Sequence, residues 1–257
     1  MHRAPAEFES DRTVTEPRAD RGGAVIAEAF QAPWPEFSLL ARLRRETRQA
    51  LLELGSEVIF EVEQPILRQG DDSTHVVLLL SGSAKVQALS ESGAATLLGI
   101  RFGGDLVGEM AALERRTRSA TITAGTLTRA RLIKSADFHR FLRERSDAAI
   151  AMILMVNARL RWANRRRIDN ANLSATQRVP RVLLEVVDTY GERDPDGCWR
   201  IGPALKHDEL ATLAGVRLRT VEKALSELDK QGVVQRQYRR IVVRDLPKLR
   251  EIADYSS

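Results

Sequence analysis

The pattern of hydrophobic and polar positions changes twice along the chain. Between residues 57 and 133, short apolar or alternating runs such as 76–80 (VVLLL) are separated by glycine-containing turns. Runs of this length at this spacing predict the strands of a barrel or sandwich. Residues 37–54 before them and 135–142 after them have helical spacing, so we expect short helices on both sides of the strands.

A long helix is predicted from about residue 147 to residue 170, a stretch without proline or glycine. Apolar residues recur along it with alternating spacings of four and three, which is a heptad seam. The seam consists of Ala149, Ile153, Val156, Leu160 and Ala163, and the other face carries Met152, Met155 and Trp162. One stripe can pack on the strands while the seam meets a second copy, so we expect a homodimer. A helix buried on both sides within a monomer is the alternative.

The C-terminal part has the order of a winged helix-turn-helix. A helix at 178–191 and a strand at 198–202 precede two amphipathic helices, 205–216 and 217–234, which are followed by strands around 233–236 and 241–244. In such a domain the N-terminal end of the second helix enters the major groove, and the wing touches phosphates. The residues expected to meet DNA are Arg217, Leu218, Arg219, Thr220, Lys223, Arg239 and Arg240. A helix pair with a solvated charged face is the alternative.

Charge and composition support this division. Residues 158–250 contain 20 Lys and Arg against 12 Asp and Glu, a net charge of +8, whereas the whole chain carries +5. A basic C-terminal part suits a polyanionic partner. The single cysteine and four scattered histidines indicate neither a disulfide framework nor a metal site. Without a membrane-length apolar run, a signal core or a catalytic motif, we expect a cytoplasmic protein that is not an enzyme.

Residues 104–123 predict an anion site. Small residues and unpaired backbone N–H groups at the start of a helical turn suit a phosphate, to which an arginine and a serine can add contacts. The predicted ligand-binding residues here are Gly108, Glu109, Met110, Ala111, Arg118 and Ser119. Because a carboxylate repels phosphate, Glu109 fits only if it turns aside toward a ribose hydroxyl. A structural ion pair between Glu109 and Arg118 is the alternative.

Residues 108–120 (GEMAALERRTRSA) resemble the phosphate-binding cassette of cyclic-nucleotide-binding domains. Together with the long helix and residues 207–234, they make the chain similar to transcription regulators of the cyclic AMP receptor protein (Crp/Fnr) family over residues 37–244. The resemblance implies an α+β fold with a cyclic-nucleotide-binding jelly-roll barrel, a long dimerisation helix and a C-terminal winged helix-turn-helix. The expected divisions are a loose extension at 1–35, then an effector domain, a dimerisation helix and a DNA-binding domain at 36–145, 146–171 and 172–257.

The chain departs from the family where the effector's base is read. At the two positions of the long helix that offer hydroxyls to adenine in the cyclic AMP receptor protein, this chain has Ala163 and Asn164. We expect Asn164 to bind ligand and the effector to be cyclic AMP or cyclic GMP. Another cyclic nucleotide, or a base held by residues elsewhere, is the alternative. Double-stranded DNA with a two-fold-related site is the expected partner, with RNA polymerase as a further candidate. An effector-independent regulator and a cyclic-nucleotide-binding module that docks protein are the alternative functions.

Overall fold

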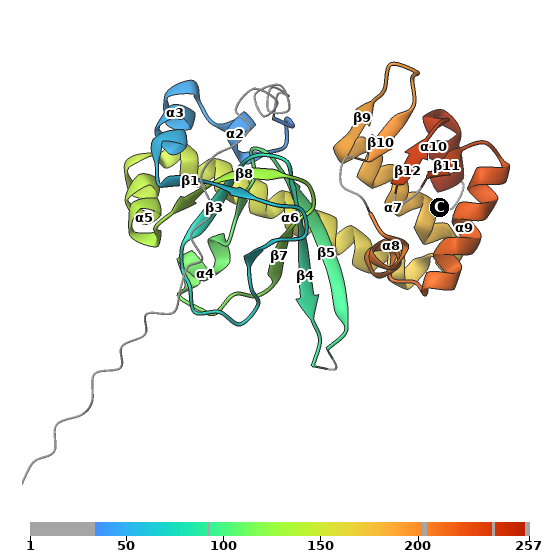
Figure 1. Cartoon of the computed structure of the whole chain (residues 1–257), viewed down its shortest axis with the longest axis horizontal. Helices are drawn as coiled ribbons and strands as arrows, with labels where there is room; N and C mark the ends of the chain where they lie inside the picture. The colour runs from blue at the N-terminus through green and yellow to red at the C-terminus, as the bar shows by residue number, and fades with distance from the viewer. Residues whose placement is uncertain (1–33, 92, 202–204, 238–239, 255–257) are drawn as a thin grey trace, which may run out of the picture. The chain divides into compact units, whose positions relative to one another are not determined.

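The computed structural model describes residues 34–91, 93–201, 205–237 and 240–254 (Figure 1). These residues belong to one compact unit that spans residues 32–257. The predicted loose extension at 1–35 falls almost entirely outside the described residues, so it stays a prediction.

Two four-stranded antiparallel sheets form the N-terminal part, in the orders β1-β8-β3-β6 and β2-β7-β4-β5. The strands are β1 (Ser56–Phe60), β2 (Pro65–Leu67), β3 (Val76–Ser81), β4 (Ser83–Leu89), β5 (Ala95–Phe102), β6 (Leu106–Val107), β7 (Thr121–Ala124) and β8 (Thr128–Ile133). Buried side chains from both sheets, including Val77, Leu79 and Ile122, share one hydrophobic core. This two-sheet arrangement confirms the predicted barrel, although the short strands β2 and β6 were not predicted.

Helices cover the other side of the first sheet. They are α2 (Leu39–Arg42), α3 (Arg45–Glu53), α5 (Ser135–Glu144) and α6 (Ser146–Asn172), while the short helix α4 (Glu109–Glu114) lies between β6 and β7. A second core joins Leu40 and Leu51 to Phe138, Met152 and Met155. The long helix is therefore confirmed, and its Met152–Met155 face packs on the strands as the pattern predicted.

The C-terminal part combines four helices with a four-stranded antiparallel sheet of order β11-β12-β10-β9. Its elements are α7 (Ala175–Tyr190), β9 (Gly191–Arg193), β10 (Trp199–Ile201), α8 (His207–Ala214), α9 (Leu218–Lys230), β11 (Val234–Gln237), β12 (Arg240–Val243) and α10 (Leu246–Asp254). The predicted helix-turn-helix and wing strands are present. Two elements were not predicted: β9, which pairs with β10 in place of part of the expected loop, and α10, which buries Leu246, Leu249 and Ala253.

Strands β4 and β5 contact helix α8 directly. Lys85 of β4 donates to both carboxylate oxygens of Glu209 at 2.8 Å, and both residues are buried. The register places Gly99 opposite Val86 and Leu97 opposite Gln87, so Leu98 is an extra residue in β5, a β-bulge. Beside it, the backbone N–H of Leu97 donates to the Thr212 hydroxyl of α8 at 3.0 Å. The bulge thus interrupts the hydrogen bonding between β4 and β5, and the backbone N–H of Leu97 bonds to the C-terminal part instead.

Candidate effector cavity and DNA-reading helix

The predicted cassette begins at a glycine that no other residue could replace without strain. Gly108 has a φ of +81° and is the N-cap of α4. A Cβ added there would lie 2.6 Å from Nη1 of Arg118 and 2.8 Å from Cδ1 of Leu67. The glycine therefore allows both the left-handed turn into α4 and the close approach of the Arg118 guanidinium.

Gly108→Ala should lower the free energy of unfolding by roughly 2–4 kcal/mol, since the left-handed conformation and the overlap with Arg118 both oppose a methyl group. Gly93→Ala is the matched control, because Gly93 has a φ of +80° but nothing within 4 Å of an added Cβ. The control should lose only about 1–2 kcal/mol. Urea unfolding of both variants measures the difference, and equal losses would show that the Arg118 contact is unimportant.

Arg118 is buried beneath the cassette, with 3% of its surface exposed. Its Nη1 donates to the Gly108 carbonyl at 2.8 Å, its Nη2 donates to the His75 carbonyl at 2.6 Å, and its Nε donates to the Ser73 hydroxyl at 3.2 Å. A guanidinium has five N–H donors, so these bonds orient the group and leave donors for an anion. Arg118 therefore joins two segments, residues 73–75 and the start of α4, around the predicted phosphate position.

Glu109 turns away from Arg118 toward the long helix. Its carboxylate lies 2.7 Å from Nη1 of Arg159, whose Nη2 donates to the Leu106 carbonyl at 2.8 Å. From the sequence, Arg118 was the alternative partner of Glu109, and Arg159 was missed. The helical spacing contained a signal, because Met155, Arg159, Trp162 and Arg166 follow one face at intervals of four, three and four. Glu109 thus joins the cassette to α6.

Burial shifts the pKa of several groups around the cavity. Desolvation raises the pKa of the Asp105 carboxyl, while Arg159, Arg101 and the Phe102 N–H oppose this shift. Desolvation, followed by the charge of Arg118, lowers the pKa of His75. Burial also lowers the pKa of Arg118, against the effect of Asp71 and Glu109. The cavity wall is therefore an environment in which charged groups are poorly solvated.

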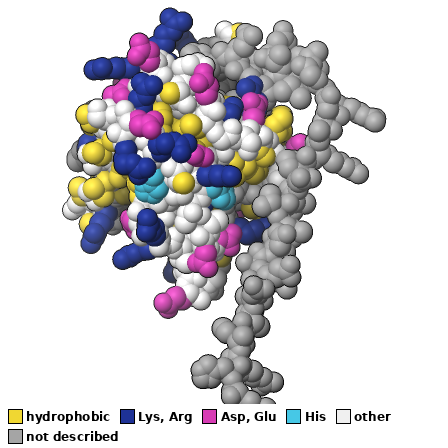
Figure 2. All heavy atoms as spheres, turned by 90° about the vertical axis from the view of Figure 1, so that its left-hand side faces the viewer, with side chains coloured by type: hydrophobic (Ala, Val, Ile, Leu, Met, Phe, Trp, Pro, Cys, Tyr) yellow, Lys and Arg dark blue, Asp and Glu magenta, His cyan; other side chains and the backbone are white. Residues whose placement is uncertain are grey.

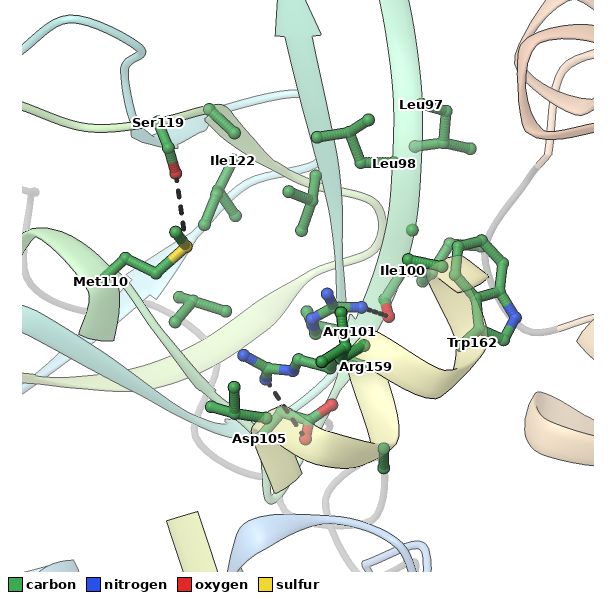
Figure 3. Close-up of a pocket in the computed structure, with 18 of the residues that line it drawn as sticks. Leu97, Leu98, Ile100, Arg101, Asp105, Met110, Ser119, Ile122, Arg159 and Trp162 are labelled. Atoms are coloured by element: carbon green, nitrogen blue, oxygen red, sulfur yellow. Dashed lines mark hydrogen bonds and ion pairs between the residues drawn. The ribbon is translucent and has the colours of Figure 1, made fainter. Parts of the chain in front are cut away.

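A cavity of about 930 Å³ lies between the cassette, strand β5 and the inner face of α6, and extends to α7 and α8. Aliphatic side chains such as Leu98, Ile100 and Ile122 form much of its wall (Figure 3). Ser119 and Met110 lie at one side, where the Ser119 hydroxyl is 3.7 Å from the Met110 sulfur. A volume of this order suits a small organic ligand.

The structure brings six of the seven predicted ligand-binding residues to this cavity. They are Gly108, Glu109, Met110, Ala111, Arg118 and Ser119. Asn164, the seventh, is exposed on α6 and is outside the cavity lining, whereas its neighbour Ala163 is in the lining. Successive residues of an α-helix point about 100° apart, so Ala163 can face the cavity while Asn164, the next residue, points away from it. A ligand contact by Asn164 stays a prediction.

Helix α9, the predicted DNA-reading helix, is anchored by a buried face and exposes the opposite one, as its pattern predicted. Val221, Ala224, Leu225 and Leu228 are buried. Among the residues expected to meet DNA, Arg217, Leu218, Arg219 and Lys223 are exposed and Thr220 is half-buried. Arg239 and the side chain of Arg240 lie outside the described residues. On a different face, over α3 and α5, basic side chains are interspersed with acidic ones (Figure 2).

The turn between α8 and α9 packs directly on the end of the long helix. Gly215 has a φ of +62° and ends α8. A Cβ added at Gly215 would lie 2.7 Å from Oδ1 of Asn170, which also accepts from Nη1 of Arg178 at 2.7 Å. The turn thus uses glycine both for its left-handed conformation and for close contact with α6.

The predicted dimer seam forms an exposed apolar stripe on α6. Ile153, Val156 and Leu160 are 57%, 42% and 56% exposed, and Ile150 beside them is 58% exposed. Ala149 is half-buried and Ala163 is exposed. Large apolar side chains that share one helix face suit a protein–protein contact.

Metal ligation and membrane insertion find no support in the part of the chain that the structure describes. Within it, no group of three or more His, Cys, Asp and Glu side chains is arranged to hold a metal ion. The helices in these same ranges include none with the length and apolarity needed to span a bilayer.

Two family models match the two functional parts of the chain. Residues 57–145 match the cyclic nucleotide-binding domain, which contains the cassette and the β-strands around the cavity. Residues 177–252 match the Crp-like helix-turn-helix domain, which contains α8 and α9.

Known proteins are similar to about three quarters of this chain. A CRP-like cAMP-activated global transcriptional regulator of Mycobacterium tuberculosis is 23% identical over 200 residues, covering 78% of this chain and 89% of the relative. The cyclic AMP receptor protein of Thermus thermophilus is 29% identical over 192 residues, covering 74% of this chain and 84% of the relative.

A solved structure supports the fold. A CRP/FNR-family transcriptional regulator from Thermus thermophilus matches with a TM-score of 0.65 and 24% identity, over 79% of this chain and all of the other. The two matched domains, their order along the chain and the fold all point to the same family. That family consists of transcription regulators rather than enzymes. The chain therefore belongs to the Crp/Fnr family of transcription regulators, with a cyclic nucleotide-binding domain and a Crp-like DNA-binding helix-turn-helix.

Proposed function

We propose that this regulator is a homodimer that reads a two-fold-related DNA site under the control of a cyclic nucleotide, cyclic AMP or cyclic GMP. One observation carries the proposal: the cavity unites the cassette with the inner face of α6, the helix that leads into the DNA-binding domain. Relatives named as cAMP-activated support this class of effector.

In the proposed complex, the phosphate lies against the start of α4, where first-turn N–H groups lack helical partners. Arg118 and Ser119 add donors from the opposite end of the cassette. Glu109 is held by Arg159 at 2.7 Å, which leaves its second oxygen for a ribose hydroxyl. The nucleotide would then touch α6 through the Glu109–Arg159 pair as well as through its base.

The exposed stripe on α6 supports the homodimer. A second copy is the proposed occupant because the stripe follows a heptad seam, and Val156, Leu160 and Ala163 also line the cavity. An effector in the cavity would thus lie beside the dimer contact. A ligand shifts the balance between two arrangements only through its different affinity for each of them.

The remaining parts of the proposal follow from this function. We assign 36–145 as the effector domain, 146–171 as the dimerisation helix and 172–257 as the DNA-binding domain. A DNA-binding regulator works in the compartment that holds its DNA, so the proposed location is the cytoplasm. RNA polymerase is a further proposed partner, since the relative from Mycobacterium tuberculosis is a named transcriptional regulator.

A combined binding and selection experiment tests the proposal. Purified full-length protein is titrated with cyclic AMP and cyclic GMP by calorimetry, and DNA is selected from a random pool with and without each nucleotide. The proposal requires that one nucleotide binds and enriches a two-fold-related site with half-sites about one helical turn apart. Equal enrichment without nucleotide would favour an effector-independent regulator, and no enrichment would favour a module that docks protein. Sedimentation of the same preparation measures the dimer.

Arg219→Ala should weaken binding to the selected site by about 5- to 150-fold and relax base preference within each half-site, because Arg219 is exposed at the reading end of α9. Lys230→Ala is the matched control, since Lys230 is exposed at the C-terminal end of the same helix. Fluorescence anisotropy with selected and scrambled duplexes measures both effects. A uniform loss on both duplexes would assign Arg219 to phosphate rather than base.

A further inference from the structure

Met110 places an oxidisable thioether in the first turn of the cassette helix. It follows Glu109 in α4, lines the effector cavity and is 50% exposed. Figure 3 shows the Met110 side chain reaching toward Ser119, whose hydroxyl donates to the Met110 sulfur at 3.7 Å. An oxidant in solution can therefore reach this sulfur beside the place where the proposed phosphate is bound.

The other methionines in the described ranges are protected from solvent. Met152 and Met155 are 8% and 2% exposed, and both belong to the core between α6 and the first sheet. Met155 also lines the cavity, so burial rather than position along the chain distinguishes it from Met110. Because oxidation of a thioether follows its exposure, Met152 and Met155 should react more slowly than Met110.

The contact with Ser119 is compatible with phosphate binding as long as the thioether is reduced. A serine hydroxyl has a single donor, and a thioether sulfur is a weak acceptor. A phosphate oxygen is a charged and much stronger acceptor. The hydroxyl can therefore leave the sulfur for the phosphate at little cost, so reduced Met110 does not compete for the Ser119 donor.

We infer that Met110 is a redox-sensitive modification site, and that its oxidation to the sulfoxide lowers the affinity of the cassette for the cyclic nucleotide. Hydrogen peroxide is the class of oxidant considered. The sulfur lone pair attacks one peroxide oxygen, so that an S–O bond forms and the O–O bond breaks. The second oxygen leaves as water after proton transfer. The sulfur gives up two electrons, and the peroxide is reduced by them.

The sulfoxide competes with the phosphate for the same donor. Its oxygen is a far better acceptor than the thioether sulfur, and the side chain that carries it becomes polar. Since the sulfur and the Ser119 hydroxyl are already 3.7 Å apart, an oxygen on the sulfur lies within hydrogen-bond reach of Ser119. Binding of the phosphate must then break this bond, a cost that the reduced protein does not have.

The effect on affinity rests on the proposed function, whereas the reaction at Met110 can be measured without nucleotide. The reference protein is the full-length Cys198→Ser variant, because the thiol of Cys198, the single cysteine, also reacts with peroxide. After timed exposure to hydrogen peroxide, peptide mass spectrometry measures the sulfoxide fraction at Met110, Met152 and Met155. Met110 should be oxidised while most of Met152 and Met155 is still reduced.

Calorimetry of the same samples measures binding of cyclic AMP and cyclic GMP. Oxidised protein should bind its nucleotide about 10- to 150-fold more weakly than reduced protein, the range for losing a hydrogen bond to a charged group. Methionine sulfoxide reductases for both sulfoxide epimers should restore the affinity. Thermal unfolding checks that the oxidised protein is folded.

Two leucine variants assign the effect to one sulfur. Met110→Leu has no thioether in the cassette, so its affinity, whatever its starting value, should be the same before and after peroxide. Met152→Leu is the matched control, because this volume-conserving change removes a buried thioether and keeps Met110. Its affinity should fall on oxidation as much as that of the reference protein.

The possible results separate the inference from the proposed function. Oxidation of Met152 or Met155 before Met110, or an oxidised Met110 that leaves the affinity unchanged, overturns the inference while the nucleotide site stands. A Met110→Leu variant that loses affinity in peroxide as strongly as the reference protein also overturns it. Reduced protein that binds neither nucleotide overturns the proposed effector site, and the effect of the sulfoxide with it.

Discussion

Arg118→Ala is expected to weaken binding of the proposed cyclic nucleotide by roughly 10- to 150-fold, the range for losing hydrogen bonds to a charged group. The variant removes the guanidinium from a site where 3% of the residue is exposed. It also leaves the carbonyls of Gly108 and His75 without the donors that hold them at 2.8 and 2.6 Å. The loss therefore combines a missing phosphate contact with a loosened cassette. Calorimetric titration measures the affinity.

Arg116→Ala is the matched control for this experiment, since Arg116 is an exposed arginine two residues away in the same loop. It should bind nucleotide like the wild type. Arg118→Lys separates the two parts of the loss, because lysine keeps the charge but cannot reproduce the planar fork. Binding by Arg118→Ala at wild-type strength would show that the phosphate lies elsewhere.

Lys85→Met should lower the free energy of unfolding by about 3–5 kcal/mol, because it leaves a buried carboxylate without its partner. The Lys85 and Glu209 side chains are 3% and 8% exposed, and they join strand β4 to helix α8 at 2.8 Å. The double variant Lys85→Met/Glu209→Gln should recover most of the loss, since replacing both charges removes the uncompensated one. Glutamine keeps an oxygen for the Lys206 N–H, which donates to Glu209 at 2.9 Å.

Glu63→Gln provides the comparison on the surface. Glu63 lies 3.6 Å from Nζ of Lys206, just before α8, and these side chains are 58% and 44% exposed. Removing such an exposed pair should change the free energy of unfolding by less than about 1 kcal/mol. Urea unfolding of the single and double variants completes the test. A double variant that is as unstable as Lys85→Met would mean that the lost stability comes from packing rather than from the unpaired, buried Glu209 carboxylate.

Local patterns in the sequence predicted most elements of the fold. The strand spacing, the long helix and the helix-turn-helix each depend on residues that are near one another in the chain. The cassette was predictable for the same reason, since Gly108 and Arg118 are ten positions apart and act together. The short strand β9 was missed because its apolar content is low and its pairing with β10 decides its conformation.

The sequence analysis did not predict the contacts between segments that are far apart in the chain. The pairing of Glu109 with Arg159 spans 50 positions, and that of Lys85 with Glu209 spans 124. Such pairs depend on how helices dock on strands: the helical spacing places Arg159 on the same face of α6 as Met155, but it does not identify Glu109 as the partner. Whether Asn164 faces the cavity depends on how α6 is rotated about its own axis against the strands, and the sequence pattern does not determine that rotation to within one residue.

The close contact between Gly215 and Asn170 has a mechanical consequence. Both residues are exposed, yet a Cβ at position 215 would lie 2.7 Å from Oδ1 of Asn170, so a larger residue there would have to displace either the Asn170 amide or the turn. The Asn170 amide is itself held by α7, because Nη1 of Arg178 donates to its Oδ1 at 2.7 Å. A side chain at position 215 would therefore disturb the point at which α6, α7 and the turn between α8 and α9 meet, so the seating of the helix-turn-helix on the long helix depends on the absence of one methyl group.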